Sequence, residues 1–200
     1  MKLLDRLQNR PRIFNLLHRL GLASARSQTS AAERACLCRH VAEAGVAVEI
    51  GTFMGVTAAE LARSLRSDAV LYCVDPYLDG QAIQAIAMRH LGRKRVLGKV
   101  RMIQATAEDA LGQLPAQVDF IFVDGDHSFE GLCKDWDVVK KLLRPGGIAA
   151  FHDVNPQPGL RVNCEGAIRC FDEVIRHDPG FRLVETCESL QVLVRGSHGS

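Results

Sequence analysis

Two glycines spaced four residues apart follow a short apolar run and could bring a ligand close to the backbone. The run at residues 46–50 ends in Gly51, and Gly55 completes the pattern Gly-x-x-x-Gly. Glycine permits a tight turn and a close approach of a ligand, but a turn that holds a dinucleotide pyrophosphate needs a further glycine, as in Gly-x-Gly-x-x-Gly. Glu49 stands just before this turn, where its carboxylate would repel a pyrophosphate and attract an ammonium group. The turn therefore favours a ligand with an ammonium group over a dinucleotide.

A carboxylate follows the next apolar run along the chain. Asp75 stands 24 residues beyond Gly51. In an open α/β sheet, an acid at this place can accept hydrogen bonds from the ribose hydroxyls of a bound nucleoside. The glycine pair alone is as compatible with tight packing as with ligand binding. Together with Asp75, it predicts a nucleoside site.

Acids and histidines follow two further apolar runs, at residues 118–123 and 148–151. They are Asp124, Asp126, His127, His152 and Asp153. The carboxyl ends of neighbouring parallel strands meet at one edge of a sheet, so we expect these side chains to gather at one rim. The unperturbed pKa of histidine, near ~6.5, makes His127 a candidate general base for a hydroxyl proton, and His127 is also a candidate metal ligand. Structural alternatives exist, since Asp126 could cap a helix and Asp153 could begin a turn.

Strands and helices must alternate to position these groups. Seven apolar runs predict strands at residues 46–50, 69–74, 100–105, 118–123, 148–151, 181–185 and 190–194. Helical patterns lie between them at residues 57–65, 81–91, 108–114, 129–143 and 166–176. This alternation predicts a doubly wound α/β fold with a mostly parallel, seven-stranded sheet. The last two strands are only about five residues apart, so they must form an antiparallel hairpin.

Two helices precede the first strand. Residues 1–21 carry an amphipathic helical pattern with a break or bend near Pro11. A second helix is capped by Thr29 or Ser30 and runs to about Ala44, and Glu33 lies in its first turn. We divide the chain into an N-terminal helical extension (1–44), a ligand-binding domain (45–195) and a flexible tail (196–200). The basic first helix could meet a membrane surface or an acidic partner. We favour packing on the core or on a second subunit, which is compatible with a homodimer.

The order of these motifs resembles the class I S-adenosylmethionine-dependent methyltransferases. The shared motifs are Glu-x-Gly-x-x-x-Gly, Val-Asp-Pro, Phe-Val-Asp-Gly-Asp-His-Ser, Pro-Gly-Gly and Phe-His-Asp. More narrowly, residues 46–194 are similar to the small bacterial group of sugar O-methyltransferases and cephalosporin-hydroxylase-like proteins. The resemblance implies a Rossmann-like methyltransferase fold and S-adenosylmethionine as cofactor. The cofactor residues that it implies are Glu49, Gly51, Thr52, Phe53 and Gly55 for the methionine part, Asp75 for the ribose, Thr106 and Ala107 with Glu108 for the adenine, and Asp124.

The resemblance also implies a metal site at the rim. Metal-dependent relatives place one acid after the fourth strand and two adjacent acids after the fifth. The matching positions here are Asp124, His152 and Asp153, and His152 departs from the pattern. Two carboxylates and an imidazole suit Mn²⁺, Fe²⁺ or Zn²⁺ as well as Mg²⁺, so metal dependence stays open. Asp124 and His127 are the predicted catalytic residues.

The resemblance predicts methylation of a hydroxyl on a small molecule, such as a sugar, a glycoside or a phenolic metabolite. The sequence does not identify this acceptor. The loop at residues 154–163, with Arg161, is placed as an acceptor lid would be. The alternatives are a non-catalytic binding module for S-adenosylmethionine and a nicotinamide-dependent oxidoreductase, which the missing third glycine disfavours.

Composition and charge restrict the partners. The net charge of +2 is small for the concentrated basic surface that nucleic acid requires, and the asparagine-proline-proline-aromatic motif of amino-methylating enzymes does not follow the fourth strand. No apolar run approaches the ~20 residues that span a bilayer, and charges interrupt any signal-peptide core. Seven scattered cysteines fit reduced thiols. We therefore expect a cytoplasmic protein with a small-molecule substrate, no nucleic-acid partner and no integral membrane segment.

Overall fold

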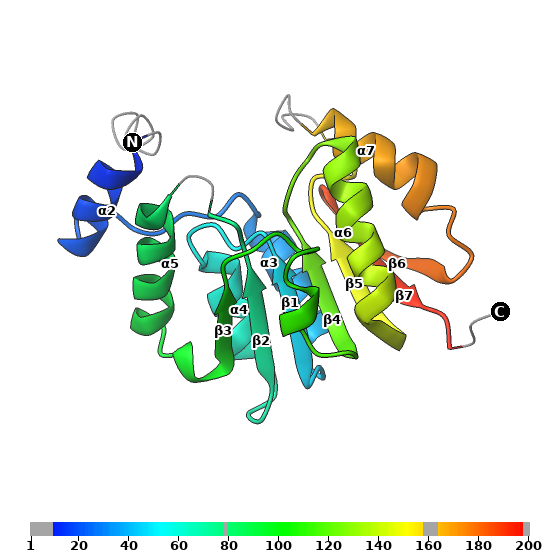
Figure 1. Ribbon diagram of the computed structural model, residues 1–200, viewed down its shortest axis with the longest axis horizontal. Helices are drawn as coiled ribbons and strands as arrows, with labels where there is room; N and C mark the ends of the chain where they lie inside the picture. Colours follow the sequence, from blue (N-terminus) through cyan, green and yellow to red (C-terminus); the bar gives the residue numbers. More distant parts are fainter. Residues whose placement is uncertain (1–9, 78–79, 158–163, 198–200) are drawn as a thin grey trace.

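One twisted sheet forms the centre of the computed structural model, which describes residues 10–77, 80–157 and 164–197. Its strand order is β3-β2-β1-β4-β5-β7-β6 (Figure 1). The strands are β1 (Val46–Ile50), β2 (Val70–Val74), β3 (Val100–Ile103), β4 (Val118–Val123), β5 (Leu143–Phe151), β6 (Phe181–Cys187) and β7 (Leu190–Arg195). β1 to β5 pair in parallel, whereas β7 runs antiparallel to both β5 and β6. The predicted seven-stranded sheet and its closing hairpin are confirmed.

The strand register brings the predicted site residues to one edge of the sheet. Ile50, the last residue of β1, pairs with Val74 of β2 and with Val123 of β4. Val123 in turn pairs with Phe151, the last residue of β5. The segments that follow these four strands therefore begin at the same edge of the sheet, as the sequence predicts.

Helices cover both faces of the sheet. They are α2 (Pro11–Arg19), α3 (Ala31–Val41), α4 (Val56–Ser64), α5 (Gln81–Arg93), α6 (Phe129–Leu142) and α7 (Glu165–Cys170). α3 and α4 pack with the face of β1 that carries Ala47, and α6 and α7 pack with the face that carries Val48 (Figure 1). α2 lies farther out, where Phe14 and Met54 join a smaller cluster with the buried side of α5. Burial on both faces explains why the central parallel strands are mostly apolar, with Glu49 in β1 and Asp119 in β4 as acidic exceptions.

Three elements differ from the sequence prediction. The helix predicted at 108–114 is only a 3₁₀ turn, Leu111–Gln113, because the Thr106 side chain pairs with Asp109 to form a turn just before it. β5 begins at Leu143 and includes the Arg-Pro-Gly-Gly segment predicted to separate helix from strand, with a register shift against β4. The helix predicted at 166–176 divides into α7 and a π-helical turn, Phe171–Ile175.

Several sequence predictions lie outside the described residues. They concern residues 1–9 of the first helix, residues 158–163 of the expected lid with Arg161, and the last three residues of the tail. The described part of the first helix begins at Pro11, where the missing proline N–H costs a helix nothing. No helix within the described ranges is long and apolar enough to cross a membrane.

Candidate functional site

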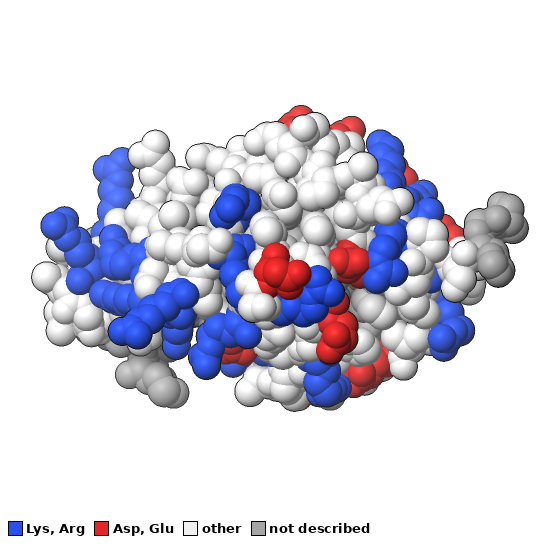
Figure 2. Space-filling view, turned by 90° about the horizontal axis from the view of Figure 1, so that it is seen from below, with Lys and Arg blue, Asp and Glu red and all other residues white. Residues whose placement is uncertain are grey.

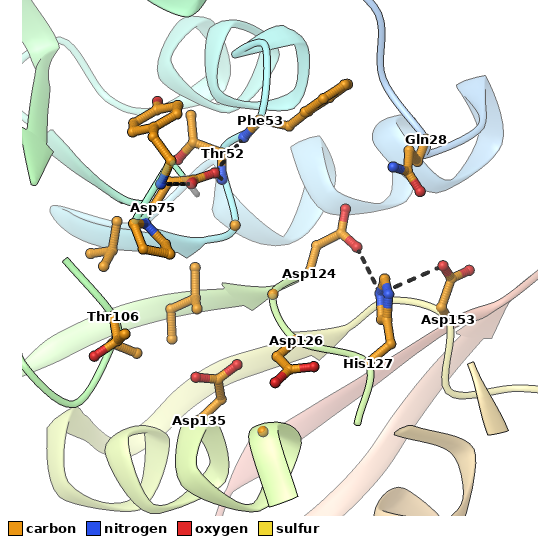
Figure 3. Close-up of a pocket in the computed structure, with 18 of the residues that line it drawn as sticks. Gln28, Thr52, Phe53, Asp75, Thr106, Asp124, Asp126, His127, Asp135 and Asp153 are labelled. Atoms are coloured by element: carbon orange, nitrogen blue, oxygen red, sulfur yellow. Dashed lines mark hydrogen bonds and ion pairs between the residues drawn. The ribbon is translucent and has the colours of Figure 1, made fainter. Parts of the chain in front are cut away.

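A cavity of about 760 Å³ opens at the carboxyl ends of β1, β2 and β4. Figure 3 shows most of its labelled side chains converging from the segments after the strands, with Asp135 from α6 and Gln28 from the segment before α3. The residues predicted from the sequence for cofactor, metal or catalysis that line it are Gly51, Thr52, Phe53, Asp75, Thr106, Ala107, Glu108, Asp124, His127 and Asp153. Glu49, Gly55 and His152 lie behind its wall. The volume is in the range of small-molecule and cofactor sites.

The first wall is the turn between β1 and α4, which depends on its two glycines. Gly51 has a φ of 88°, and a Cβ there would collide with the backbone carbonyl of Asp124. Gly55 has a φ of 74° and begins α4 in the left-handed conformation. Both values lie where residues with a side chain are strained. The predicted tight turn is confirmed, and it passes directly over the end of β4.

Asp75 ties this turn to the end of β2. Its Oδ2 accepts hydrogen bonds from the backbone N–H groups of Thr52 (2.9 Å) and Phe53 (2.8 Å). Its Oδ1 accepts one from the N–H of Tyr77 (2.7 Å). Carboxylate oxygens have lone pairs beyond these three bonds. Asp75 therefore organises the turn and still faces the cavity with capacity to accept hydrogen bonds (Figure 3).

Glu49 occupies a different place from the one that the sequence suggests. Its side chain is fully buried beneath the turn, on the Ala47 face of β1, with Thr52 and Cys73 as polar neighbours. Among the described residues, neither carboxylate oxygen has a hydrogen-bond partner. Burial raises the pKa of Glu49 well above its usual range. Glu49 lies beneath the turn and is not among the residues that line the cavity, so its contact with an ammonium group stays a prediction.

The second wall holds a cluster of two histidines and two carboxylates. Nδ1 of His152 lies 3.0 Å from Oδ1 of Asp124 and 3.5 Å from Oδ2 of Asp153. Nε2 of His127 lies 3.4 Å and 3.6 Å from the same two oxygens (Figure 3). The four atoms lie within 4.8 Å of one another. The cluster gathers every residue that the sequence placed at this rim for chemistry, except the helix-capping acid Asp126.

Asp153 reaches the cluster through an unusual backbone conformation. Its φ is 57°, in the left-handed region that residues with a side chain rarely adopt. Such conformations carry a cost and recur at functional sites. The turn after β5 thus directs a carboxylate toward Asp124 and His127.

Glu33 is a member of this site that the sequence analysis does not identify. It comes from the first turn of α3, and its Oε2 lies 3.2 Å from Nε2 of His152. Its Oε1 accepts hydrogen bonds from the Ser189 N–H (3.1 Å) and hydroxyl (2.6 Å), and its Oε2 accepts one from the Ser30 N–H (2.7 Å). The prediction that Thr29 or Ser30 caps this helix is confirmed for Ser30, which forms a capping box with Glu33. Capping alone accounts for a glutamate at this position, so the sequence gives no sign of its second contact.

The histidines and carboxylates hold one another in their charged forms. Burial would lower the pKa of His152, but Asp124 and Glu33 raise it to about 10. Burial would raise the pKa of Glu33, but hydrogen bonds from His152 and Ser189 lower it to about 2. Contact with Asp124 raises the pKa of His127. Yet Nε2 of His127 is buried without a hydrogen bond of good geometry among the described residues.

Asp126 and Asp135 are further acids on the cavity wall. Asp126 accepts hydrogen bonds from the Ser128 N–H (2.9 Å) and hydroxyl (3.0 Å), so it braces the cap of α6, as one sequence alternative suggests. Asp135 lies in the buried stripe of α6, and burial raises its pKa to about 7. An acid three residues after Leu132 in an apolar stripe is the sequence signal that could have identified it.

Residues 48–154, more than half of the chain, match the protein family described as a methyltransferase domain. A mycobacterial protein (Mycobacterium sp. strain JLS) named "Putative O-methyltransferase" is 33% identical over 116 residues, which are 56% of this chain and 50% of that protein. The chain therefore spans about half the length of the curated relatives that it matches.

Two solved structures share the fold. The O-methyltransferase TomG of tomaymycin synthesis from Streptomyces achromogenes, in complex with S-adenosylmethionine, is 20% identical (TM-score 0.68, 90% of this chain and 86% of that chain). An O-methyltransferase from Bacillus cereus, in complex with S-adenosylhomocysteine, is also 20% identical (TM-score 0.70, 94% and 90%). At this identity the likeness establishes the fold.

Proposed function

Because the chain belongs to the methyltransferase-domain family, we propose that it transfers the methyl group of S-adenosylmethionine to a hydroxyl oxygen of a small molecule. The predicted resemblance to class I methyltransferases is confirmed by this membership. The observation that carries the proposed oxygen chemistry is the cluster of Asp124, His127, His152 and Asp153 beside the cavity.

The cavity suits the cofactor in its volume and in its polar groups. The backbone turn at residues 51–53 would hold the methionine part, Asp75 the ribose, and Thr106 with Ala107 the adenine. The buried hydroxyls of Thr52 and Tyr77, which have no hydrogen-bond partner among the described residues, are further groups that a bound ligand could satisfy. When bound, the cofactor supplies an activated methyl group for an in-line displacement.

The four-residue cluster fits a divalent metal ion. Neighbouring ligand atoms of one divalent ion with bonds of ~2.1 Å lie roughly 3.0 to 3.4 Å apart, and the four His-carboxylate distances are 3.0, 3.5, 3.4 and 3.6 Å. The unsatisfied Nε2 of His127 is the group that such an ion would engage. When bound, the ion supplies Lewis acidity that lowers the pKa of a hydroxyl. Imidazole ligands favour Mn²⁺, Fe²⁺ or Zn²⁺ over Mg²⁺.

The residues of the cluster have separate tasks. Asp124, His127 and Asp153 line the cavity and would face the acceptor, whereas His152 lies behind them and would hold the ion through its Nδ1. Glu33 fixes the orientation of the His152 ring, which directs Nδ1 at the two aspartates, in the way that carboxylates orient metal-binding histidines. His127, predicted as the general base, is equally placed as a fourth ligand, and we assign it that role because its Nε2 faces both carboxylates.

The acceptor proposal covers sugars, glycosides and phenols, whose hydroxyl groups all need their proton removed before they attack a methyl group.

A cytoplasmic location and a homodimer remain predictions from the sequence. Light scattering of the purified protein would test the homodimer.

Cofactor binding can be measured without a known acceptor. We expect isothermal titration calorimetry to detect S-adenosylmethionine and S-adenosylhomocysteine, and Asp75→Ala to weaken both by more than about tenfold, because it removes one carboxylate from the turn and the ribose site. Asp68→Ala is the matched control, since Asp68 is an exposed acid just before the same strand. Undetectable binding of both ligands to the unmodified protein would contradict the proposal.

A further inference from the structure

Basic residues gather at one end of the molecule, although the chain as a whole is almost neutral. Residues 10–30 and 80–107, which we call the basic lobe, contain ten Lys or Arg residues and no Asp or Glu. The remaining chain holds 15 basic and 23 acidic residues. Figure 2 shows Lys and Arg concentrated at the end that carries α2 and α5, and the acids toward the centre and the other end. The small net charge of the whole chain therefore conceals a strongly basic surface.

An apolar stripe runs along the outer side of α2, within this basic surface. Ile13, Leu16 and Leu20 are 41%, 55% and 62% exposed, and their spacing places them on one side of the helix. Arg12 and Arg19 flank the stripe and are exposed. Leu22, 65% exposed, continues it beyond the helix end. Four large exposed apolar residues within the ten residues from Ile13 to Leu22 mark an interaction surface.

The opposite side of α2 is fixed to α5, so the helix cannot turn this stripe inward. Phe14 and His18 are fully or almost fully buried against the neighbouring helix. The Arg89 guanidinium donates to Asn15 (3.0 Å) and to Nδ1 of His18 (3.0 Å), and Arg93 donates to the His18 carbonyl (3.0 Å). The stripe is therefore held outward by a rigid support.

We propose that the basic lobe docks on an anionic lipid surface, with the stripe of α2 entering the interface between headgroups and acyl chains. Amphipathic helices with basic flanks bind membranes in this way, through buried apolar area and attraction to anionic lipids. A nucleic acid would pair with the arginines but leave the leucines uncovered. A second copy of the chain would cover the leucines, but it would also bring two acid-free basic surfaces together. Of these three occupants, a lipid surface alone satisfies both features, and its docking does not depend on the catalytic proposal.

Vesicle co-sedimentation of the full chain tests this proposal. We expect binding to phosphatidylcholine vesicles that contain phosphatidylglycerol, little binding to phosphatidylcholine alone, and release as salt screens the attraction. The double substitution Arg12→Gln/Arg19→Gln should weaken binding roughly 30-fold, at about 1 kcal/mol for each arginine near the surface. Leu16→Ser/Leu20→Ser should weaken it at least as much. Both pairs are exposed, so circular dichroism should show that the fold is unchanged.

The matched control lies on β6, where Arg182→Gln/Val184→Ser removes an exposed basic and an exposed apolar side chain at the other end of the sheet. This variant should bind vesicles like the unmodified protein. Three results would overturn the proposal: no binding to anionic vesicles, binding that the leucine variant does not change, or a dimer in light scattering that the leucine variant dissociates. Salt-sensitive binding to a DNA duplex without vesicle binding would assign the surface to nucleic acid instead.

Discussion

Two buried histidines show how differently one side chain behaves in two regions of this molecule, the outlying helix α2 and the segment after β5. His18 is 1% exposed and lies between Arg89 and Arg93, and burial together with these cations lowers its pKa to about 4. His152 is 4% exposed and lies between Asp124 and Glu33, which raise its pKa to about 10. His18 is thus a neutral imidazole that accepts hydrogen bonds from arginines, whereas His152 is a charged imidazolium that is paired with carboxylates.

The neighbours of each histidine, and not its own burial, decide this difference. Both follow apolar residues in the sequence, Leu17 and Phe151, and although Asp153 beside His152 points to a polar site, no neighbour in the sequence of either histidine reveals the direction of its pKa shift. The partners of His18 lie 71 and 75 residues away, and Glu33 lies 119 residues from His152. Site chemistry in this fold is therefore set by which elements pack together.

The largest expected effect concerns His127, which, like His152, lies against Asp124 and Asp153. His127→Ala should lower the affinity for Mn²⁺ or Co²⁺ by more than about 100-fold, because removal of a ligand costs more than removal of a supporting contact. Calorimetric titration of the purified protein measures this affinity. His177→Ala, at an exposed histidine after the π-helical turn, is the control. Unchanged metal affinity with lost methyl transfer would instead make His127 the general base.

A smaller effect is expected when the carboxylate behind His152 is neutralised. Glu33→Gln keeps the hydrogen-bonding shape and the capping box but removes the charge that orients the imidazole. Metal affinity should fall about 10- to 100-fold, with S-adenosylmethionine affinity nearly unchanged. Glu43→Gln, at an exposed acid just beyond α3, should change neither. Equal losses of metal and cofactor affinity would indicate general loosening of the fold and would refute a specific role for Glu33.

The smallest effect belongs to His18 and follows from the sign of its pKa shift. Its folded pKa, about 4, lies below the ordinary 6.5, so the unfolded chain binds more protons as the pH falls through 6.5. Arg89, Arg93 and His90 face it, and no acid contributes to the shift. Between pH 7.5 and 5.5 the protein should lose about 1 kcal/mol of unfolding free energy that His18→Gln does not lose. Urea unfolding at both pH values gives this difference, and a parallel loss in the variant would contradict it.

The sequence allowed the sheet and most of the site to be predicted because both depend on local patterns. Seven apolar runs, the glycine pair and the polar residues after each strand suffice to place Gly51, Asp75, Asp124 and Asp153 at one edge. Glu33 could not be predicted in the same way, since its capping role fully explains its position in the sequence. The buried place of Glu49 could not be predicted either, because strand alternation fixes its face but not the depth of the cavity. The segregation of charge was hidden by the whole-chain average.

The collision that a side chain at Gly51 would make with the Asp124 carbonyl has a consequence for how this protein can vary. The turn that is proposed to hold the cofactor and the strand end that carries the proposed reacting groups rest on each other through backbone atoms, with no adjustable side chain between them. Under the proposed function, the spacing between methyl donor and acceptor is therefore a property of the main chain. Changes in specificity must come from the surrounding loops, since neither half of the site can shift without carrying the other along.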